Sequence, residues 1–411
     1  MIPPMKQFAL LAGLILPALV TAHPGHNVKA EASERAASMA QMQHRSLSHC
    51  AEKLKNRGIE QRSIARRSAA VEKLRKKRSL EPRNFKEVLN TSHHSTEYYN
   101  TSTPADILFI GNNSCILTPE VTEGPYYVTG ELIRENVIEK ETGVPLTYEV
   151  QVIDINTCEP LTGVMLEMWH CNSTQKGVYG GIAGGNANGV SDDRELNNTM
   201  LRGIQPSKEE GVVTFETIFP GHYIGRTPHI HVMAHFNTTV LPNNTISGGT
   251  ISHVGQLFFD QSLISAVEAT SPYNTNTQPL TTNEQDFIMA QESETTDPVL
   301  HYTLVGNKIE EGLFGWIAFG VDPKANKTVS AAANYGKDGG KANPNPGFPG
   351  GPGMPPFPTG GFPPGFSFPG GFPTGFPTGF PFPPGGPRTS ATASVSGSPS
   401  KAQPTQTAGV A

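Results

Sequence analysis

The sequence of 411 residues is short of charge and has no long apolar stretch, and each shortage excludes a class of protein. Charged residues make up 16% of it, the formal net charge is -5, and the region expected to fold has no basic patch, which argues against nucleic-acid binding. The apolar run from Phe8 to Val20 is too short for a comfortable membrane span. No apolar run closes the chain, which argues against a C-terminal lipid anchor. These absences favour a small-molecule partner.

The apolar run near the N-terminus has the features of an export signal. Lys6 precedes it and the small-residue ending Val20-Thr21-Ala22 follows it, so residues 1–22 are predicted to be a signal peptide. Asn-x-Ser/Thr sequons agree with a secreted, extracellular glycoprotein. They begin at Asn90, Asn100, Asn112, Asn172, Asn197, Asn237, Asn243 and Asn326.

Four cysteines in an oxidising compartment allow three disulfide pairings. We favour a bond between Cys158 and Cys171, because these residues flank one predicted strand. A second bond between Cys50 and Cys115 would tie the N-terminal segment to the core. Buried free thiols are the alternative.

Composition divides the chain after the signal peptide into three parts. Residues 23–105 are polar and favour helix, and their basic run Arg75-Lys76-Lys77-Arg78 is either a solvated helix face or a dibasic processing site. Residues 106–325 consist of short strand patterns between turn residues, which predicts an all-β fold, an antiparallel β-sandwich. Residues 326–411 are predicted to be a disordered tail, rich in Gly, Pro and Phe and then in Ser and Thr. The tail is a candidate for contact with a cell wall or another polymer.

The strand prediction depends on alternation of apolar and polar residues. Tyr148, Val150 and Val152 alternate with Glu149 and Gln151, as in a strand with one buried face. Further strands are expected at 164–169, 212–219, 229–236, 256–259, 299–304 and 316–321. Within this core, only 262–267 and 282–291 are predicted to be helical.

A candidate metal site lies in residues 220–231. On an extended strand, His229 and His231 project from the same face, so both imidazoles can reach one ion. The apolar residues that alternate with them along 229–236 are expected to face the core. No His-Glu-x-x-His helix is present for zinc, and no carboxylate has a spacing that indicates a 2-His-1-carboxylate Fe(II) site. Tyr223 and Tyr179 are the remaining candidate ligands. A phenol, with an ordinary pKa of about 10, binds as phenolate only to a metal that strongly favours this form, and Fe(III) does so.

Several motifs follow one another along residues 115–322. They are Thr122-Glu123-Gly124-Pro125-Tyr126-Tyr127, Trp169-His170 with Gly177-Val178-Tyr179, Arg202-Gly203-x-Gln205, Pro220-Gly221-x-Tyr223, Arg226-x-x-His229-x-His231 and Gln256-Leu257-Phe258-Phe259. In this order they resemble the intradiol ring-cleavage dioxygenases, which are the catechol and protocatechuate dioxygenases.

This resemblance implies roles for individual residues. The implied ligands of a non-haem Fe(III) are Tyr179, Tyr223, His229 and His231. Arg226 is implied to stabilise negative charge that develops on the substrate ring, and Gln256 to lie in the same pocket. Tyr126 is implied to line the substrate entrance, whereas Arg202 and Gln205 are implied to be structural.

The implied reaction opens a catechol-type ring with O2 between its two hydroxylated carbons and gives a cis,cis-muconate-type product. One tyrosinate, assigned as Tyr223, would leave the metal and act as a base. Only two residues separate Tyr223 from Arg226, where the intracellular enzymes have a longer loop, so the substrate pocket is expected to differ. A non-catalytic, secreted or wall-associated binding protein on the same scaffold is the alternative.

Two further histidines could be mistaken for ligands. His170 follows a strand tryptophan and is expected to be a hydrogen-bonded structural residue. His235 is expected to lie too far along its strand to reach the same ion.

Overall fold

The computed structural model describes residues 47–80, 114–115, 124, 126–174, 177–182, 194–293 and 297–344. The predicted signal peptide lies outside these residues, as does the predicted tail after residue 344. Among the described helices, none is both long enough and apolar enough to cross a membrane.

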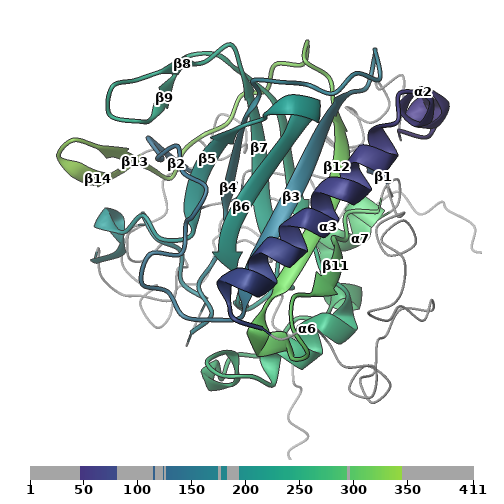
Figure 1. The fold of residues 1–411 in the computed structure, drawn as a ribbon. Coiled ribbons are helices and arrows are strands. Elements are labelled where there is room, and N and C mark those ends of the chain that lie inside the picture. Colours follow the sequence, from purple (N-terminus) through teal and green to yellow (C-terminus); the bar gives the residue numbers. More distant parts are fainter. Residues whose placement is uncertain are drawn as a thin grey trace, which may run out of the picture. The chain divides into compact units, whose positions relative to one another are not determined.

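Two β-sheets build the core (Figure 1). The first contains β1 (Ser114–Cys115), β3 (Pro145–Asp154), β6 (Val212–Ile218), β11 (His301–Leu304) and β12 (Leu313–Val321). The second contains β4 (Met165–Trp169), β5 (Arg202–Pro206), β7 (Ile230–Phe236) and β10 (Thr250–Leu257). The order is β1-β12-β3-β6 in the first sheet, where β11 also pairs with β12, and β10-β7-β4-β5 in the second.

The second sheet is antiparallel throughout, as predicted, but the first is mixed. In the first sheet, β12 runs parallel to β3, with Leu313 opposite Leu146, and β1 runs parallel to β12. A fully antiparallel sandwich is therefore a wrong prediction for this sheet. Alternation within a strand indicates which face is buried, but it does not determine which strand lies beside it or in which direction.

The inner faces of the two sheets pack into one hydrophobic cluster. Tyr148 and Val150 of the first sheet belong to it, together with Met168 and Val232 of the second, and all four side chains are fully buried. The alternation predicted for β3 and β7 is confirmed in the choice of core-facing residues. A single buried face is a wrong prediction for β3, since its outward-facing residues, Glu149 among them, are buried too.

Helix α3 (Ile59–Lys77) belongs to the N-terminal segment, in which helices were predicted, and lies across the outer face of the first sheet (Figure 1). The buried Arg67 side chain contacts the Glu149 carboxylate at 2.5 Å, and its guanidinium lies 5.4 Å from the ring centre of Trp316. The predicted basic run ends this helix: Arg75 donates to the carbonyl of Val305 at 2.8 Å. The run thus forms part of a packed helix, and processing beside it stays a prediction.

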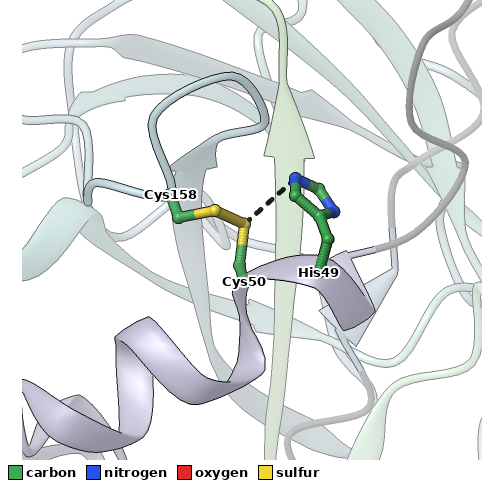
Figure 2. Close-up of side chains that lie close together, drawn as sticks. All are labelled: His49, Cys50 and Cys158. Atoms are coloured by element: carbon green, nitrogen blue, oxygen red, sulfur yellow. Dashed lines mark hydrogen bonds between the residues drawn. A yellow bond between two sulfur atoms is a disulfide. The ribbon is translucent and has the colours of Figure 1, made fainter.

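The disulfide joins Cys50 to Cys158, so both predicted pairings are wrong (Figure 2). Cys171 is a buried free thiol that donates to the carbonyl of Gly221 at 3.2 Å. Strand β4 separates Cys158 from Cys171, and five residues of strand span about 17 Å, whereas bonded cysteines need Cα atoms within about 7 Å. His49 lies beside the disulfide, but the bond engages both sulfur atoms and leaves no thiolate for a metal (Figure 2).

Shorter elements complete the described structure. Helices α6 (Gln261–Glu268) and α7 (Phe287–Ser293) lie at the two predicted helical segments, and α2 (Ala51–Asn56) precedes α3. The short strands are β2 (Val128–Thr129), β8 (Thr239–Val240), β9 (Ile246–Ser247), β13 (Ala333–Gly336) and β14 (Gly339–Ala342). The 3-10 turns are η1 (Leu47–Cys50), η2 (Arg194–Asn197), η3 (Glu209–Gly211), η4 (Tyr273–Thr275), η5 (Asn283–Gln285) and η6 (Ile309–Glu311). Strand pairing thus continues past residue 326, where the tail was predicted to begin, because β13 pairs with β2.

Candidate metal centre

One row of side chains crosses the outer face of the second sheet. In the paired strands β10, β7, β4 and β5 the row consists of Gln256, His231, Trp169 and Arg202. Directly paired residues of antiparallel strands project from the same face. Alternate residues of β7 fill the core, so the row faces away from it.

The four predicted ligand side chains meet on this face. His229 Nε2 lies 3.1 Å from His231 Nε2 and 3.4 Å from the Tyr223 hydroxyl. The rings of Tyr223 and Tyr179 meet edge to face, with 5.7 Å between their centres. All four side chains are buried, and they come from two segments: one carries Tyr179 and the other carries Tyr223, His229 and His231. The fold therefore brings the four predicted ligand side chains together.

The protonation of the two imidazoles follows from their neighbours. His229 Nδ1 lies 2.6 Å from the carbonyl oxygen of Thr227, which can only accept, so Nδ1 carries the proton and Nε2 presents a lone pair. Burial, then the neighbouring His229 and Arg226, lower the pKa of His231 well below its ordinary value. His231 is therefore neutral, and its Nδ1 has no hydrogen-bond partner among the described residues.

A cation between the two Nε2 atoms would satisfy both lone pairs and leave the proton of His231 on Nδ1, whereas a hydrogen bond between the rings leaves Nδ1 as an acceptor. If His231 Nε2 carries the proton, its Nδ1 becomes a buried acceptor that no described residue satisfies. If Nε2 is unprotonated, two lone pairs face each other at 3.1 Å. Atoms that bind one ion at about 2 Å lie about 3 Å apart, which agrees with the observed distances of 3.1 and 3.4 Å. The residues present thus fit a metal ion.

The two tyrosines restrict the kind of metal. Burial raises the pKa of Tyr179 well above its ordinary value. Burial also raises the pKa of Tyr223, although the nearby Arg226 opposes this shift. Both phenols are therefore protonated unless a strongly charged cation replaces the protons. Two phenolates and two neutral imidazoles fit a hard trivalent ion such as Fe(III), because the phenolates offset much of its charge.

Arg202 holds two of the aromatic segments in place. It donates to the carbonyls of Gly180 at 2.7 Å and of Tyr126 at 2.6 Å, and its guanidinium lies 5.9 Å from the ring centre of Tyr179. The Tyr126 ring stacks on Tyr179 at 4.1 Å between ring centres. Gln205 lies further along β5, opposite Leu166. Arg202 therefore positions the predicted entrance residue against a predicted ligand.

Arg226 and Gln256 form a buried pair beside the donors. The guanidinium donates from Nη2 to Gln256 Oε1 and from Nε to Asp286 Oδ2 at 2.8 Å. This contact identifies Oε1 as the acceptor and leaves Nε2 of Gln256 as a buried donor with no partner in the described part of the chain. Burial lowers the pKa of Arg226, but Asp286 and Tyr223 outweigh this effect, so the net shift is upward and the group stays charged.

Asp286 is the residue that the sequence reasoning missed. Its Oδ2 accepts from the backbone of Thr227 and its Oδ1 from the backbone of Ile288 and Met289, so it also caps the start of α7. The sequence placed Asp286 inside a helix predicted at 282–291, whereas α7 begins directly after it. Nothing in the sequence links it to Arg226, which lies sixty positions earlier.

The short spacing between Tyr223 and Arg226 forms a tight turn. The backbone N–H of Arg226 donates to the carbonyl of Tyr223 at 3.3 Å, and Gly225 at the third position has a φ of 91°. A type II turn needs a positive φ at that position, which glycine supplies without strain. Ile224, at the second position, is 49% exposed. The turn therefore keeps Tyr223 beside Arg226 and presents an apolar side chain at the edge of the site.

The other two histidines lie where they were expected. His170 is hydrogen-bonded through both nitrogens, to the carbonyl of Cys171 at 2.8 Å and the hydroxyl of Thr217 at 2.7 Å. His235 Nε2 contacts Glu167 Oε2 at 2.6 Å. Burial lowers the pKa of each histidine to about 4, so both are neutral.

Comparison with known proteins found similarity among solved structures alone. No protein-family model and no curated protein matches this chain. An intradiol ring-cleavage dioxygenase from Tetranychus urticae is 31% identical, with 52% of this chain and 98% of that one covered and a TM-score of 0.43. The dioxygenase domain of a dioxygenase carbohydrate-binding protein fusion from Streptomyces sp. SirexAA-E is 25% identical over 50% of this chain and 98% of that one, with a TM-score of 0.32.

Catechol 1,2-dioxygenase from Pseudomonas arvilla C-1 is 17% identical over 52% of this chain and 65% of that one, again with a TM-score of 0.32. This chain is similar to intradiol ring-cleavage dioxygenases over about half of its length.

Proposed function

We propose that this protein is a secreted, non-haem Fe(III) intradiol dioxygenase that opens catechol-type rings with O2 to cis,cis-muconate-type products. The observation that carries the proposal is the buried meeting of two imidazoles and two phenols. Within that cluster, the Nε2 atoms of the two imidazoles face each other at 3.1 Å, although His229 Nε2 carries no proton. A protein that uses the sandwich only as a scaffold for binding gains nothing from such an arrangement.

Tyr179, Tyr223, His229 and His231 would hold the iron, which when bound withdraws electron density and makes a catecholate ring reactive towards O2. Tyr223 would act as a base for a substrate hydroxyl. Its buried position raises its pKa, so a phenolate at this place takes up a proton readily. The tight turn holds that phenol beside Arg226, where the anionic substrate would be neutralised.

Arg226 and Gln256 would stabilise the negative charge that develops on the substrate. Asp286 fixes the guanidinium at 2.8 Å in a fully buried position, so the cation does not need to reorganise during the reaction. Gln256 Nε2, which has no partner in the described region, would donate to a substrate oxygen. Both groups would stabilise negative charge on the substrate more strongly here than in water, because the surrounding dielectric constant is low.

Aromatic rings would exclude water and favour a flat substrate. Trp169 stacks on His231 at 4.8 Å between ring centres, and Tyr126 stacks on Tyr179. A catechol offers a planar ring and two adjacent oxygens that bind one ion together, so it matches both the walls and the metal. Ile224 at the exposed edge adds an apolar contact for the ring or its substituent.

Secretion is supported by the disulfide and by exposed sequons. A bond between Cys50 and Cys158 persists in an oxidising compartment. The exposed sequon asparagines among the described residues are Asn197, Asn237, Asn243 and Asn326. Asn172 is buried and its Oδ1 accepts from the backbone of Val178, so this sequon is not a glycan site in the folded protein.

The test is oxygen uptake by the iron-loaded protein with catechol, hydroxyquinol and protocatechuate, with identification of the product by mass. We expect about one iron per chain, a visible tyrosinate-to-iron absorption band, and one O2 consumed per ring opened. The His229→Ala variant, which should lack a metal ligand, serves as the negative control for both iron content and oxygen uptake. A colourless preparation that iron cannot reconstitute would overturn the proposal, and catechol binding without oxygen uptake would favour the binding protein instead.

A further inference from the structure

A second cluster of buried ionisable groups occupies the same outer face, next to the row that contains His231. Glu167 lies two residues before Trp169 on β4 and therefore on the same side of the strand. Glu167, Glu131 and His235 are all buried. None of these three is part of the candidate metal centre.

The cluster forms a continuous chain of contacts that ends at Arg202. His235 Nε2 lies 2.6 Å from Glu167 Oε2, and the carboxyl groups of Glu167 and Glu131 are hydrogen-bonded to each other. Glu131 Oε1 accepts from Arg202 Nη1 at 3.2 Å. Arg202 in turn holds the carbonyls of Tyr126 and Gly180, so the chain of contacts reaches the segment that carries Tyr179.

Two touching carboxyl groups need a proton between them. Two carboxylates at hydrogen-bond distance repel each other, and a bond between them requires that one is protonated. Burial raises the pKa of Glu131, and it raises the pKa of Glu167 to about 8. His235 is neutral, and Arg202 supplies one positive charge. One carboxylate and one shared proton therefore balance the guanidinium.

A small pocket borders one member of this pair. Glu131 and Arg202 line it together with Arg134. Arg134 donates to the carbonyls of Arg202 and Thr199, so it is already engaged at the pocket wall. Glu131 is therefore the carboxyl group of the pair that lies nearer to the surface.

We propose that Glu131 and Glu167 share one proton and thereby balance Arg202, so that Arg202 holds the Tyr126 and Tyr179 segments at the candidate metal centre. The two glutamates are positioning residues, because they act through Arg202. The statement that Tyr179 is a metal ligand rests on the proposed function, whereas the shared proton does not. Loss of this proton would leave a second, uncompensated negative charge that draws Arg202 away from the two carbonyls.

The sign of the pH effect follows from the raised pKa. The folded pair keeps a proton that an unfolded glutamate, with an ordinary pKa of 4.5, loses. The pair therefore stabilises the fold fully below about pH 4.5, and this stabilisation is lost as the pH rises through about 8. Glu167→Gln keeps the shape and a hydrogen-bond donor but cannot lose a proton.

The first measurement compares melting temperatures of the iron-free protein between about pH 5 and about pH 9. We expect the wild type to lose more stability towards high pH than Glu167→Gln does. Glu310→Gln, the same change at an exposed site, should follow the wild type. Parallel curves for the wild type and Glu167→Gln would overturn the shared proton.

The second measurement is the near-ultraviolet circular dichroism of the same iron-free samples. The stacked Tyr126 and Tyr179 rings contribute to this signal, and comparison with a Tyr126→Leu variant identifies their contribution. We expect this contribution to change between about pH 6 and about pH 9 in the wild type and to stay constant in Glu167→Gln. An identical response in both proteins would overturn the positioning role. Neither readout uses iron, so failure of the wild type to bind iron would count against the proposed function alone.

Discussion

The outer faces of the two sheets both bury polar and charged groups, but they differ in how those groups meet. Under α3, Arg67 and Glu149 contact each other as an ion pair, and Trp316 covers the guanidinium. Unsatisfied buried atoms occur on both faces: His301 Nε2, on the ring that stacks on Trp316, has no hydrogen-bond partner within the described residues. Burial and a single unmade hydrogen bond therefore do not distinguish a structural cluster from a functional one. The second face differs because the Nε2 atoms of two imidazoles and a phenol oxygen converge within 3.4 Å, as the ligands of one ion would.

The largest effect should come from removal of an imidazole from the second face. We expect His229→Ala to lower the iron content from about one per chain towards zero and to abolish the visible band, because Nε2 faces both His231 and Tyr223. Metal analysis of the purified variant checks this. Tyr223→Phe should also lose iron, since the hydroxyl is a donor. Normal iron in both variants would place the metal elsewhere.

Replacement of Arg226 should slow the reaction without loss of the metal. We expect Arg226→Ala to keep its iron but to turn over catechol about 100- to 1,000-fold more slowly, because a preorganised cation is lost. This change also leaves Asp286 buried without its partner. The double variant Arg226→Ala with Asp286→Asn therefore controls for that charge, and it should be more stable but equally slow. Iron loss equal to that of His229→Ala would mean that Arg226 is only structural.

Glu149→Gln should affect stability alone. It leaves the buried Arg67 with an uncompensated charge, so the free energy of unfolding should fall by about 3 kcal/mol. Chemical denaturation measures the loss, and the visible band of the iron-loaded protein should not change. A shift of that band would mean that the two outer faces are coupled, which would contradict the comparison.

Removal of the disulfide should have a smaller effect. We expect Cys50→Ser with Cys158→Ser to lower the free energy of unfolding by about 2–4 kcal/mol, because the bond closes a long loop in the unfolded chain. Cys171→Ser is the matched control: it keeps a donor for the carbonyl of Gly221 and should cost about 1 kcal/mol or less. A larger loss from Cys171→Ser would mean that the pairing differs from Cys50–Cys158.

Local pattern predicted much of the fold and of the candidate site. Alternation in β7 indicated that His229 and His231 share a face opposite the core, and the structure has them so. The helix predicted at 262–267 was located correctly, at α6, whereas the one predicted at 282–291 begins five residues later, at α7. These features depend on residues that are neighbours in the chain, where the periods of strand and helix relate sequence position directly to direction.

Contacts between distant residues could not be predicted in the same way. The parallel pairing of β12 with β3 and the disulfide between Cys50 and Cys158 each join segments more than a hundred residues apart. Cys158 and Cys171 are close in sequence, yet a strand carries them to opposite ends. The disulfide prediction was wrong because it used separation in sequence, whereas the distance between the two cysteines in space decides whether they can bond.

The sequence by itself determined the chemical types of the donors and the face on which the two histidines lie, because residue identity and the period of a strand are local properties. Only the tertiary structure decided that Tyr179 meets Tyr223, that Asp286 fixes Arg226, and that Glu131 lies against Glu167. Each of these contacts joins separate elements, and packing across the sheet sets which buried polar groups find a partner and which do not.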